Sequence, residues 1–277
     1  MKDILIDGVL DTLKLLPYLF ITFIILEFIE HKVSNKSKKI LVNNKKYGPI
    51  LGGLLGGLPQ CGFGVVASNL FSSKVITMGT VIAVFLSTSD EMLPIMLSEK
   101  TNIGVIFKII GFKVLIGIII GFIVDLFIKD DNKIEVKEIC EKDHCHCNHE
   151  NLFISSIKHT LKIGLFILIA NLLINTIIFQ VGEDNLKRLL LDKNILTYFI
   201  ASLIGLIPNC ASSVIITELY LSKLITIGTL LSGLLTGCGL GLLVLFRTNK
   251  NLKENIKVLF LIYLIGVLVG LLVDMMI

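Results

Sequence analysis

Three cysteines and three histidines that could hold a metal ion fall within ten positions of this 277-residue chain: Cys140, His144, Cys145, His146, Cys147 and His149. Thiolates and imidazoles bind Zn(II), Cu(I), Ni(II) or Co(II) far better than Mg(II) or Ca(II). Because the spacing is irregular and contains no repeated CxxC pair, we expect a loop that captures or senses metal and no folded zinc module. The alternative is a solvated linker whose metal affinity is incidental.

A second set of candidates consists of polar side chains within apolar segments, where they are functional candidates by default. Carboxylates suit Mn(II) or Mg(II) and can exchange protons, and thiols add softer ligands. The predicted transport site comprises Gln60, Cys61, Asn69, Ser89, Asp90, Glu91, Asn209, Cys210, Ser212 and Glu218. Two alternatives are open, since a buried cysteine is often only a small apolar side chain and the adjacent carboxylates could lie near the outer interface.

Six of these candidates occupy corresponding positions in two halves of the chain, since Gln60 matches Asn209, Cys61 matches Cys210 and Asn69 matches Glu218. Pro59-Gln60-Cys61 recurs 149 positions later as Pro208-Asn209-Cys210, and of the 22 residue pairs from 59/208 to 80/229 ten are identical. Duplication within an apolar chain is typical of transporters built from two repeats, whose substrate site lies where the repeats meet.

The composition predicts an all-α membrane protein that crosses the bilayer several times. Hydrophobic residues make up 54% of the chain and charged residues 17%, with a mean hydropathy of +0.85. Six apolar stretches have about the length of a spanning helix, roughly 17–25 residues: residues 15–29, 75–97, 103–128, 163–179, 225–246 and 258–273. A buried core helix of a soluble protein would explain one such stretch but not six.

Two further apolar segments, residues 49–71 and 195–219, are interrupted by Pro59 and Pro208. Each half has about ten residues, too few to cross a bilayer alone, and proline removes a backbone donor. Non-helical backbone inside a membrane is tolerated only where it is buried in protein or lines a cavity. The paired interruptions therefore predict broken or re-entrant helices beside a binding site. A proline kink packed against neighbouring helices is the alternative.

Lysine-rich loops predict the topology. Residues 31–47 contain six lysines and no acid, and residues 247–257 are also basic, so both should be cytoplasmic. If each interrupted segment makes no net crossing, the repeats are inverted and the Cys/His loop is cytoplasmic; if each crosses once, the repeats are parallel. We favour inversion because reduced thiols belong in the cytoplasm. The predicted domains are a first membrane repeat (1–128), a cytoplasmic His/Cys-rich linker (129–152) and a second membrane repeat (153–277).

Other corresponding residues favour structural roles. Asp125 matches Asp274, and Lys108 matches Lys257, near the ends of spans, where long side chains reach the interface. The GxxxG pairs in the same spans predict close helix packing. The chain has no P-loop, HExxH or GxSxG motif, so we expect no enzyme. A metal-sensing or scaffold membrane protein is a further alternative, in which the Cys/His loop would matter and the interrupted helices would not.

Three motifs carry a resemblance to a known family: Leu-Pro-Gln-Cys-Gly-Phe-Gly at 58–64, Ser-Thr-Ser-Asp-Glu-Met-Leu-Pro at 87–94, and Ile-Pro-Asn-Cys at 207–210. The chain resembles, over nearly its whole length, the ten-span heavy-metal exporters, arsenic-permease-like membrane proteins often labelled manganese transporters. It is also distantly similar to the organoarsenical permeases, although it has no Cys-Ser-Cys run. The resemblance implies ten membrane segments and export of a metal.

We therefore predict a secondary active transporter that exports a divalent transition metal, manganese or a heavier one, across the cytoplasmic membrane of a prokaryote by proton antiport. In this prediction Asp90, Glu91 and Glu218 bind the cation and exchange protons. An organic-anion or metalloid permease is the alternative, since half-helix ends can direct positive dipoles at an anion. We expect no cofactor, because the metal ion is the transported substrate. The expected partners are the cation and the lipid bilayer, and no nucleic acid. The sequence leaves open whether the chain forms a homo-oligomer.

Overall fold

The computed structural model describes residues 47–58, 62–89, 92–128 and 195–276, except for the side chains of residues 210 and 211, together with single residues within 13–24 and 157–190. These residues form helices and, within the described part of the chain, no strand. The first half contributes α3 (Gly48–Gly56), α4 (Gly62–Ser72), α5 (Met78–Ser87), α6 (Met92–Ser98) and α7 (Ile103–Phe127). The second half contributes α11 (Leu196–Gly205), α12 (Cys210–Leu221), α13 (Ile227–Thr236), α14 (Leu240–Thr248) and α15 (Leu252–Met276).

Four stretches are long and apolar enough to cross a membrane: Met78–Ser98, Ile103–Phe127, Ile227–Thr248 and Leu252–Met276. They agree with four of the six predicted spans, and the other two lie largely outside the described residues. The helices α7 and α15 have 25 residues each, which gives a length of about 37 Å. Large apolar side chains such as Phe107 and Phe260 are exposed on them, as expected of surfaces that face lipid. The chain is therefore a multi-pass membrane protein.

Helix interruptions divide most of the remaining chain into short pieces. The helix α3 ends at Gly56 and α4 begins at Gly62, while α11 ends at Gly205 and α12 begins at Cys210. Both interruptions agree with the prediction from Pro59 and Pro208. Two of the predicted continuous spans are also interrupted, because α5 ends at Ser87 and α13 ends at Thr236. Both stretches are candidate spans as predicted, but each consists of two helices rather than one.

In the first half, Asp125 ties α5 to α7. Gly79 N donates to one carboxylate oxygen of Asp125 at 2.8 Å, and Thr77 Oγ1 donates to the other at 2.7 Å. Thr77 is also the N-cap of α5, since its Oγ1 accepts a hydrogen bond from Thr80 N at 3.1 Å. The carboxylate thus satisfies backbone and side-chain donors at a helix N-terminus, where negative charge is favoured.

The second half repeats this arrangement at the corresponding residues. Gly228 N donates to Asp274 at 2.8 Å, and Thr226 Oγ1 donates to the same carboxylate while capping α13. Tyr198 adds a third donor, with its hydroxyl 2.7 Å from Asp274 Oδ2. The sequence assigned these two aspartates no ligand role, and the structure shows instead that they clamp α5 to α7 and α13 to α15.

Glycines bring the clamped helices close together. A Cβ on Gly121 would lie 2.7 Å from the carbonyl oxygen of Gly79, and one on Gly270 would lie 2.5 Å from that of Gly228. Atoms larger than hydrogen do not fit at these distances, so the GxxxG glycines of α7 and α15 are packing residues, as predicted.

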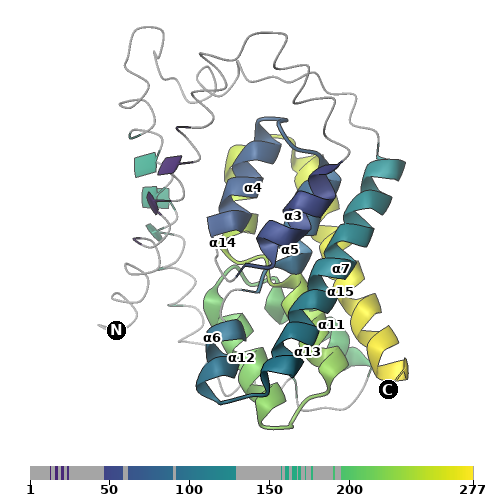
Figure 1. Ribbon diagram of the computed structural model, residues 1–277. Coiled ribbons are helices and arrows are strands. Elements are labelled where there is room, and N and C mark those ends of the chain that lie inside the picture. Colours follow the sequence, from purple (N-terminus) through teal and green to yellow (C-terminus); the bar gives the residue numbers. More distant parts are fainter. Residues whose placement is uncertain are drawn as a thin grey trace, which may run out of the picture.

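The corresponding helices of the two halves lie at opposite ends of the molecule. Figure 1 shows α4 and α14 in its upper half and α6 and α12 in its lower half, with α7 and α15 running along one side. The helix α4 packs against α14, and α12 packs against α6. Each half therefore packs one of its short helices onto a short helix of the other half at each end.

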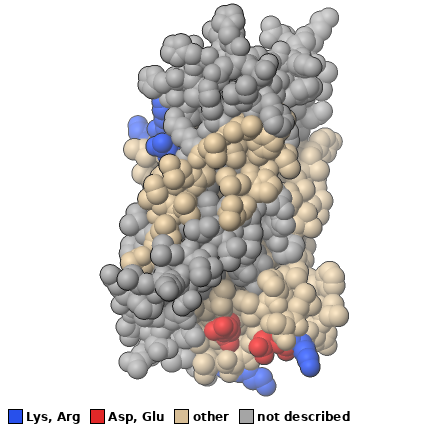
Figure 2. Space-filling model, turned by 90° about the vertical axis from the view of Figure 1, so that its left-hand side faces the viewer, with Lys and Arg blue, Asp and Glu red and all other residues tan. Residues whose placement is uncertain are grey.

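Charged side chains differ between the two ends. Figure 2 shows lysine or arginine without acid near the upper end of the visible described surface, and acids mixed with basic residues at the lower end. Near the α14–α15 turn the described cations are Arg247, Lys250, Lys253 and Lys257. The α6–α7 turn, at the opposite end, carries Glu99 together with Lys100.

Candidate functional site

Three of the helix interruptions approach one another inside the bundle. A Cβ on Gly237, between α13 and α14, would lie 3.5 Å from Ser213 Oγ near the start of α12. The carbonyl oxygen of Cys238, in the same interruption, would lie 3.5 Å from a Cβ on Gly64 near the start of α4. Gly239 has a φ of 52°, a left-handed conformation that glycine adopts without strain. The interruption between α13 and α14 thus lies beside the first turns of both α4 and α12.

The ends of α5 and α13 lie in the same region. A Cβ on Gly56, the last residue of α3, would clash with Ser87 at the end of α5. At the corresponding place, a Cβ on Gly205 would clash with Thr236 at the end of α13. Phe85 of α5 also contacts the start of α14, because a Cβ on Gly241 would lie 2.8 Å from Phe85 Cε1. The described helix ends that border the four interruptions therefore lie close to one another.

A buried cation that was not predicted from the sequence lies beside the α5–α6 interruption. Lys113 lies near the middle of α7 with a fully buried side chain, and its Nζ donates a hydrogen bond to the carbonyl oxygen of Thr88. It is about 15 Å along the helix from Ile103, too far from either end for its amine to reach the interface. A charged group at this depth is a functional candidate, and its distance from the ends of the span was the available signal.

The predicted residues of the α5–α6 interruption are described in part. Ser89 is 1% exposed, and its Oγ donates to the carbonyl oxygen of Ser87 at 3.1 Å. Asp90 and Glu91 lie outside the described residues. Since consecutive Cα atoms are about 3.8 Å apart, the chain keeps Asp90 next to buried Ser89 and Glu91 next to Met92.

Two predicted residues lie together at the start of α12. Asn209 and Ser212 are both buried, and Ser212 Oγ donates to the carbonyl oxygen of Asn209 at 2.9 Å. The side chain of Cys210, between them, lies outside the described part. The α11–α12 interruption thus presents polar groups to the interior, next to the α13–α14 interruption.

Asn69 and Glu218 correspond by repeat but have different surroundings. Asn69 on α4 is 3% exposed, and its Nδ2 has no hydrogen-bond partner among the described residues. Glu218 is exposed on α12, about 12 Å along the helix from Cys210. The structure therefore does not bring Glu218 together with Asn209 and Ser212.

Gln60, Cys61 and all six residues of the Cys/His loop (140–149) lie outside the described residues. Within the described ranges, no group of three or more His, Cys, Asp or Glu side chains is arranged to hold a metal ion.

The α5–α6 interruption and the α13–α14 interruption correspond by repeat, but only the first has charged residues. Ser89, Asp90 and Glu91 correspond to Cys238, Gly239 and Leu240, and Lys113 corresponds to Ile262, which is fully buried. The two halves thus share a scaffold, but only the first carries charge at this interruption.

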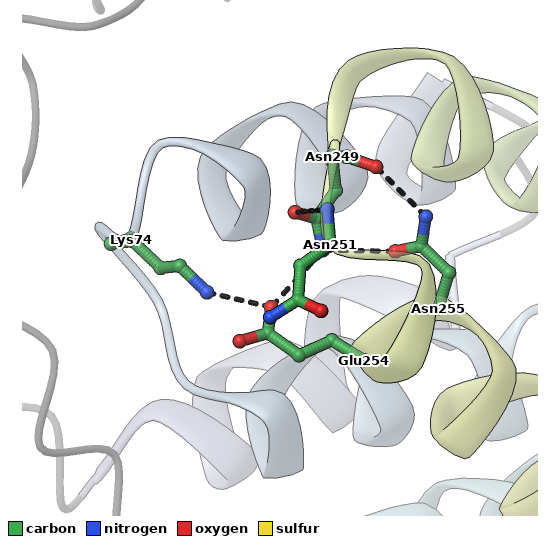
Figure 3. A network of polar contacts seen from close by, with 5 residues as sticks. All are labelled: Lys74, Asn249, Asn251, Glu254 and Asn255. Atoms are coloured by element: carbon green, nitrogen blue, oxygen red, sulfur yellow. Dashed lines mark hydrogen bonds and ion pairs between the residues drawn. The ribbon is translucent and has the colours of Figure 1, made fainter.

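A polar network joins the two halves at the end where α14 meets α15 (Figure 3). Lys74, in the turn after α4, forms an ion pair with Glu254 of α15 at 2.6 Å. Asn249 Nδ2 donates to Glu254 at 3.1 Å and to Asn255 Oδ1 at 2.8 Å. Asn255 in turn donates to the carbonyl oxygen of Asn249 at 2.9 Å, and Asn251 N donates to Asn249 Oδ1 at 3.2 Å. The network lies away from the interruptions, so it stabilises contact between the halves.

Spanning helices combined with interrupted helices that meet in the interior define a membrane protein of the transporter class. Residues 1–184 match the model of a family described as "Putative, 10TM heavy-metal exporter". The match covers more than half of the chain, so the chain belongs to this family, and the predicted resemblance to it is confirmed. The motifs at 58–64 and 87–94 lie within the matched residues, and the motif at 207–210 lies beyond them. The family description is that of an exporter and names no catalytic activity. Neither the curated proteins nor the solved structures contain a match.

Proposed function

We propose that this protein is a secondary active transporter that exports a divalent transition metal, manganese or a heavier one, across the cytoplasmic membrane of a prokaryote. The observation that carries the proposal is the meeting of four helix interruptions inside a membrane protein, one of them continuing into Asp90 and Glu91. Unwound backbone and half-helix ends form the substrate sites of many secondary transporters. The family description supports a metal as the substrate and export as the direction.

We assign the cation to the α5–α6 interruption. Asp90 and Glu91 would bind it and exchange protons, which makes proton antiport the driving reaction, and no nucleotide-binding motif offers another source of energy. Ser89, Asn209 and Ser212 would line the site together with Gln60, Cys61 and Cys210. Glu218 is left out because it is exposed and distant from the interruptions. The Cys/His loop would collect metal on the cytoplasmic side.

The two repeats would be inverted relative to each other. The opposite positions of α4 and α12 in Figure 1, and of α6 and α14, support this orientation. The end that carries Lys74, Arg247, Lys250 and Lys253 would be cytoplasmic by the positive-inside rule. Because α7 ends at that same end, the linker 129–152 would also face the cytoplasm.

Efflux measurements in a metal-sensitive host test the proposal with Mn²⁺, Zn²⁺, Co²⁺, Ni²⁺, Cd²⁺ and arsenite. We expect the wild type to protect against at least one divalent cation. The Asp90→Asn/Glu91→Gln variant should lose this protection, and deletion of residues 140–149 should only weaken it. Glu99→Gln is the control, since this carboxylate is exposed in the turn after α6. Protection that does not depend on Asp90 and Glu91, or none against any divalent cation, would contradict the proposal.

An anionic metalloid or organic anion is the second candidate substrate, and the buried ammonium of Lys113 is the observation that favours it. An anion would be attracted both by Lys113 and by the N-terminal ends of α12 and α14. In that case Lys113→Gln should abolish transport of the anion, while Asp90→Asn/Glu91→Gln should leave it in place.

A further inference from the structure

The α5–α6 interruption already holds a cation, which belongs to the protein itself. Lys113 Nζ donates to the carbonyl oxygen of Thr88, the first residue after α5. This carbonyl belongs to the C-terminal end of a half-helix, which carries partial negative charge. Carbonyl groups at such ends coordinate cations in secondary transporters. The ammonium therefore occupies a position at which a transported cation would find a ligand.

The lysine and the carboxylates occur as a set. The first half has Asp90, Glu91 and Lys113, and at the corresponding positions the second half has Gly239, Leu240 and Ile262. The surrounding scaffold is similar, since both hydrogen bonds of the α5–α7 clamp recur at the corresponding residues of the α13–α15 clamp. Helix packing therefore does not require a lysine at this depth. Positively and negatively charged residues occur together at the α5–α6 interruption, and neither occurs at the α13–α14 interruption. This co-occurrence indicates that Lys113 acts together with Asp90 and Glu91.

We propose that the ammonium of Lys113 is a tethered competitor of the transported cation; this inference rests on the function proposed above. Without metal, the ammonium neutralises part of the negative charge of the site. A metal ion must displace it in order to bind, and its return promotes release of the metal. A monovalent ion brings no more charge than the ammonium it displaces, whereas a divalent ion brings twice as much. Lys113 thereby selects divalent over monovalent cations.

The test measures Mn²⁺ binding and Mn²⁺ efflux by the purified full-length chain in proteoliposomes. Lys113→Met and Lys113→Gln remove the charge, and Lys113→Arg keeps it. Occupancy by a competitor raises the apparent Kd in inverse proportion to the fraction of sites left unoccupied, so a competitor that occupies about 90% of the sites weakens binding about tenfold. We therefore expect both neutral variants to bind Mn²⁺ at least about tenfold more tightly, to export it at least about tenfold more slowly, and to become sensitive to Na⁺. Lys113→Arg should retain weak binding, rapid export and insensitivity to Na⁺.

Lys108→Met is the matched control, because Lys108 lies on the same helix with an exposed side chain; it should bind and export as the wild type does. Should the neutral variants fold poorly, the wild type supplies an independent readout. Acylation of the Lys113 amine by a small reagent, followed by peptide mass analysis, should increase with Mn²⁺ and not with Na⁺. Acylation unaffected by Mn²⁺ would overturn the inference.

The outcomes separate this inference from the function on which it rests. If the wild type exports Mn²⁺ and the folded neutral variants bind it no more tightly, the competitor role is overturned and the exporter remains. If the wild type moves arsenite or an organic anion instead of a divalent cation, and the neutral variants lose that transport, Lys113 binds the substrate itself. A wild type that neither binds nor moves any divalent cation contradicts the proposed function directly.

Discussion

The helices α7 and α15 are the corresponding long spans of the two halves, and they share the residues that set their packing. The shared pairs are Gly117 and Gly266, Gly121 and Gly270, and Asp125 and Asp274. They differ where Lys113 of α7 meets the α5–α6 interruption, because Ile262 stands at that position in α15. The duplicated scaffold has been kept while one copy of the interior site carries the charge. A symmetric fold can thus hold an asymmetric site.

The largest loss of stability is expected when α15 receives the lysine of α7. Ile262→Lys would bury an ammonium beside Gly239 and Leu240, which offer no carboxylate, so we expect a loss of about 3–5 kcal/mol in unfolding free energy. Thermal unfolding of the detergent-solubilised protein measures this loss. Ile262→Met keeps the side-chain volume and should cost less than about 1.5 kcal/mol. A stable Ile262→Lys variant would mean that a lysine at this depth needs no acidic partner.

The glycine contacts test whether the two halves share one scaffold. A Cβ on Gly79 would clash with the carbonyl oxygen of Gly121, and one on Gly228 with that of Gly270. Gly79→Ala and Gly228→Ala should therefore each lower the stability by about 3 kcal/mol, measured by thermal unfolding.

The control for these glycines is Gly111→Ala on α7, where no atom lies within 4 Å of the added Cβ. It should be neutral or raise the stability by up to about 1 kcal/mol, since alanine favours helix. If Gly79→Ala and Gly228→Ala were as harmless as this variant, the close packing of the clamped helices would be refuted.

The sequence predicted the interruptions at Pro59 and Pro208 because proline cannot continue a helix hydrogen-bond ladder. It did not predict the interruption after Ser87, since the residues that follow, Thr88 and Ser89, include neither proline nor glycine. At the corresponding place Gly237 and Gly239 gave a signal, and Gly239 does adopt a left-handed conformation. Breaks without such residues depend on tertiary contacts that a local pattern does not contain.

Lys113 was missed for a related reason. The helix α7 has no continuous polar face, so hydropathy alone does not reveal which face points into the bundle. The signal was the spacing of Lys113, Gly117 and Gly121, which places the lysine on the same face as the packing glycines. The clamp formed by Asp125 joins residues 46 and 48 positions apart, and no local spacing predicts such contacts. The repeat itself was the useful signal, because it paired Asp125 with Asp274 before their partners were visible.

The aspartate clamps give a third prediction, of intermediate size. Asp125→Asn and Asp274→Asn replace a charged acceptor of several hydrogen bonds, so each should lower the stability by about 1.5–3 kcal/mol. Tyr198→Phe removes one neutral donor from Asp274 and should cost about 1 kcal/mol. Urea or thermal unfolding of matched preparations measures these losses. Equal stability of Asp274→Asn and the wild type would show that the second clamp contributes nothing.

The smallest effects on stability are expected for substitutions in the turns after α4 and α12. Lys74 and Lys223 correspond and have nearly the same left-handed backbone, with φ values of 57° and 58°. Glycine is preferred at this position after a helix. Lys223 is exposed, whereas Lys74 is paired with Glu254 and lies 5.2 Å from the centre of the Phe71 ring. The same substitution should therefore have opposite signs in the two halves.

Lys223→Gly relieves the left-handed conformation and should raise the stability by about 0.5 kcal/mol, after the greater flexibility of the unfolded chain is allowed for. Lys74→Gly gains the same relief but loses a partly buried ion pair, so we expect a net loss of about 1 kcal/mol. Lys100→Gly, with a φ of 52° and an exposed side chain, should behave like Lys223→Gly. Thermal unfolding at low and high salt measures all three. A stabilising Lys74→Gly would mean that the network in Figure 3 does not hold the two halves together.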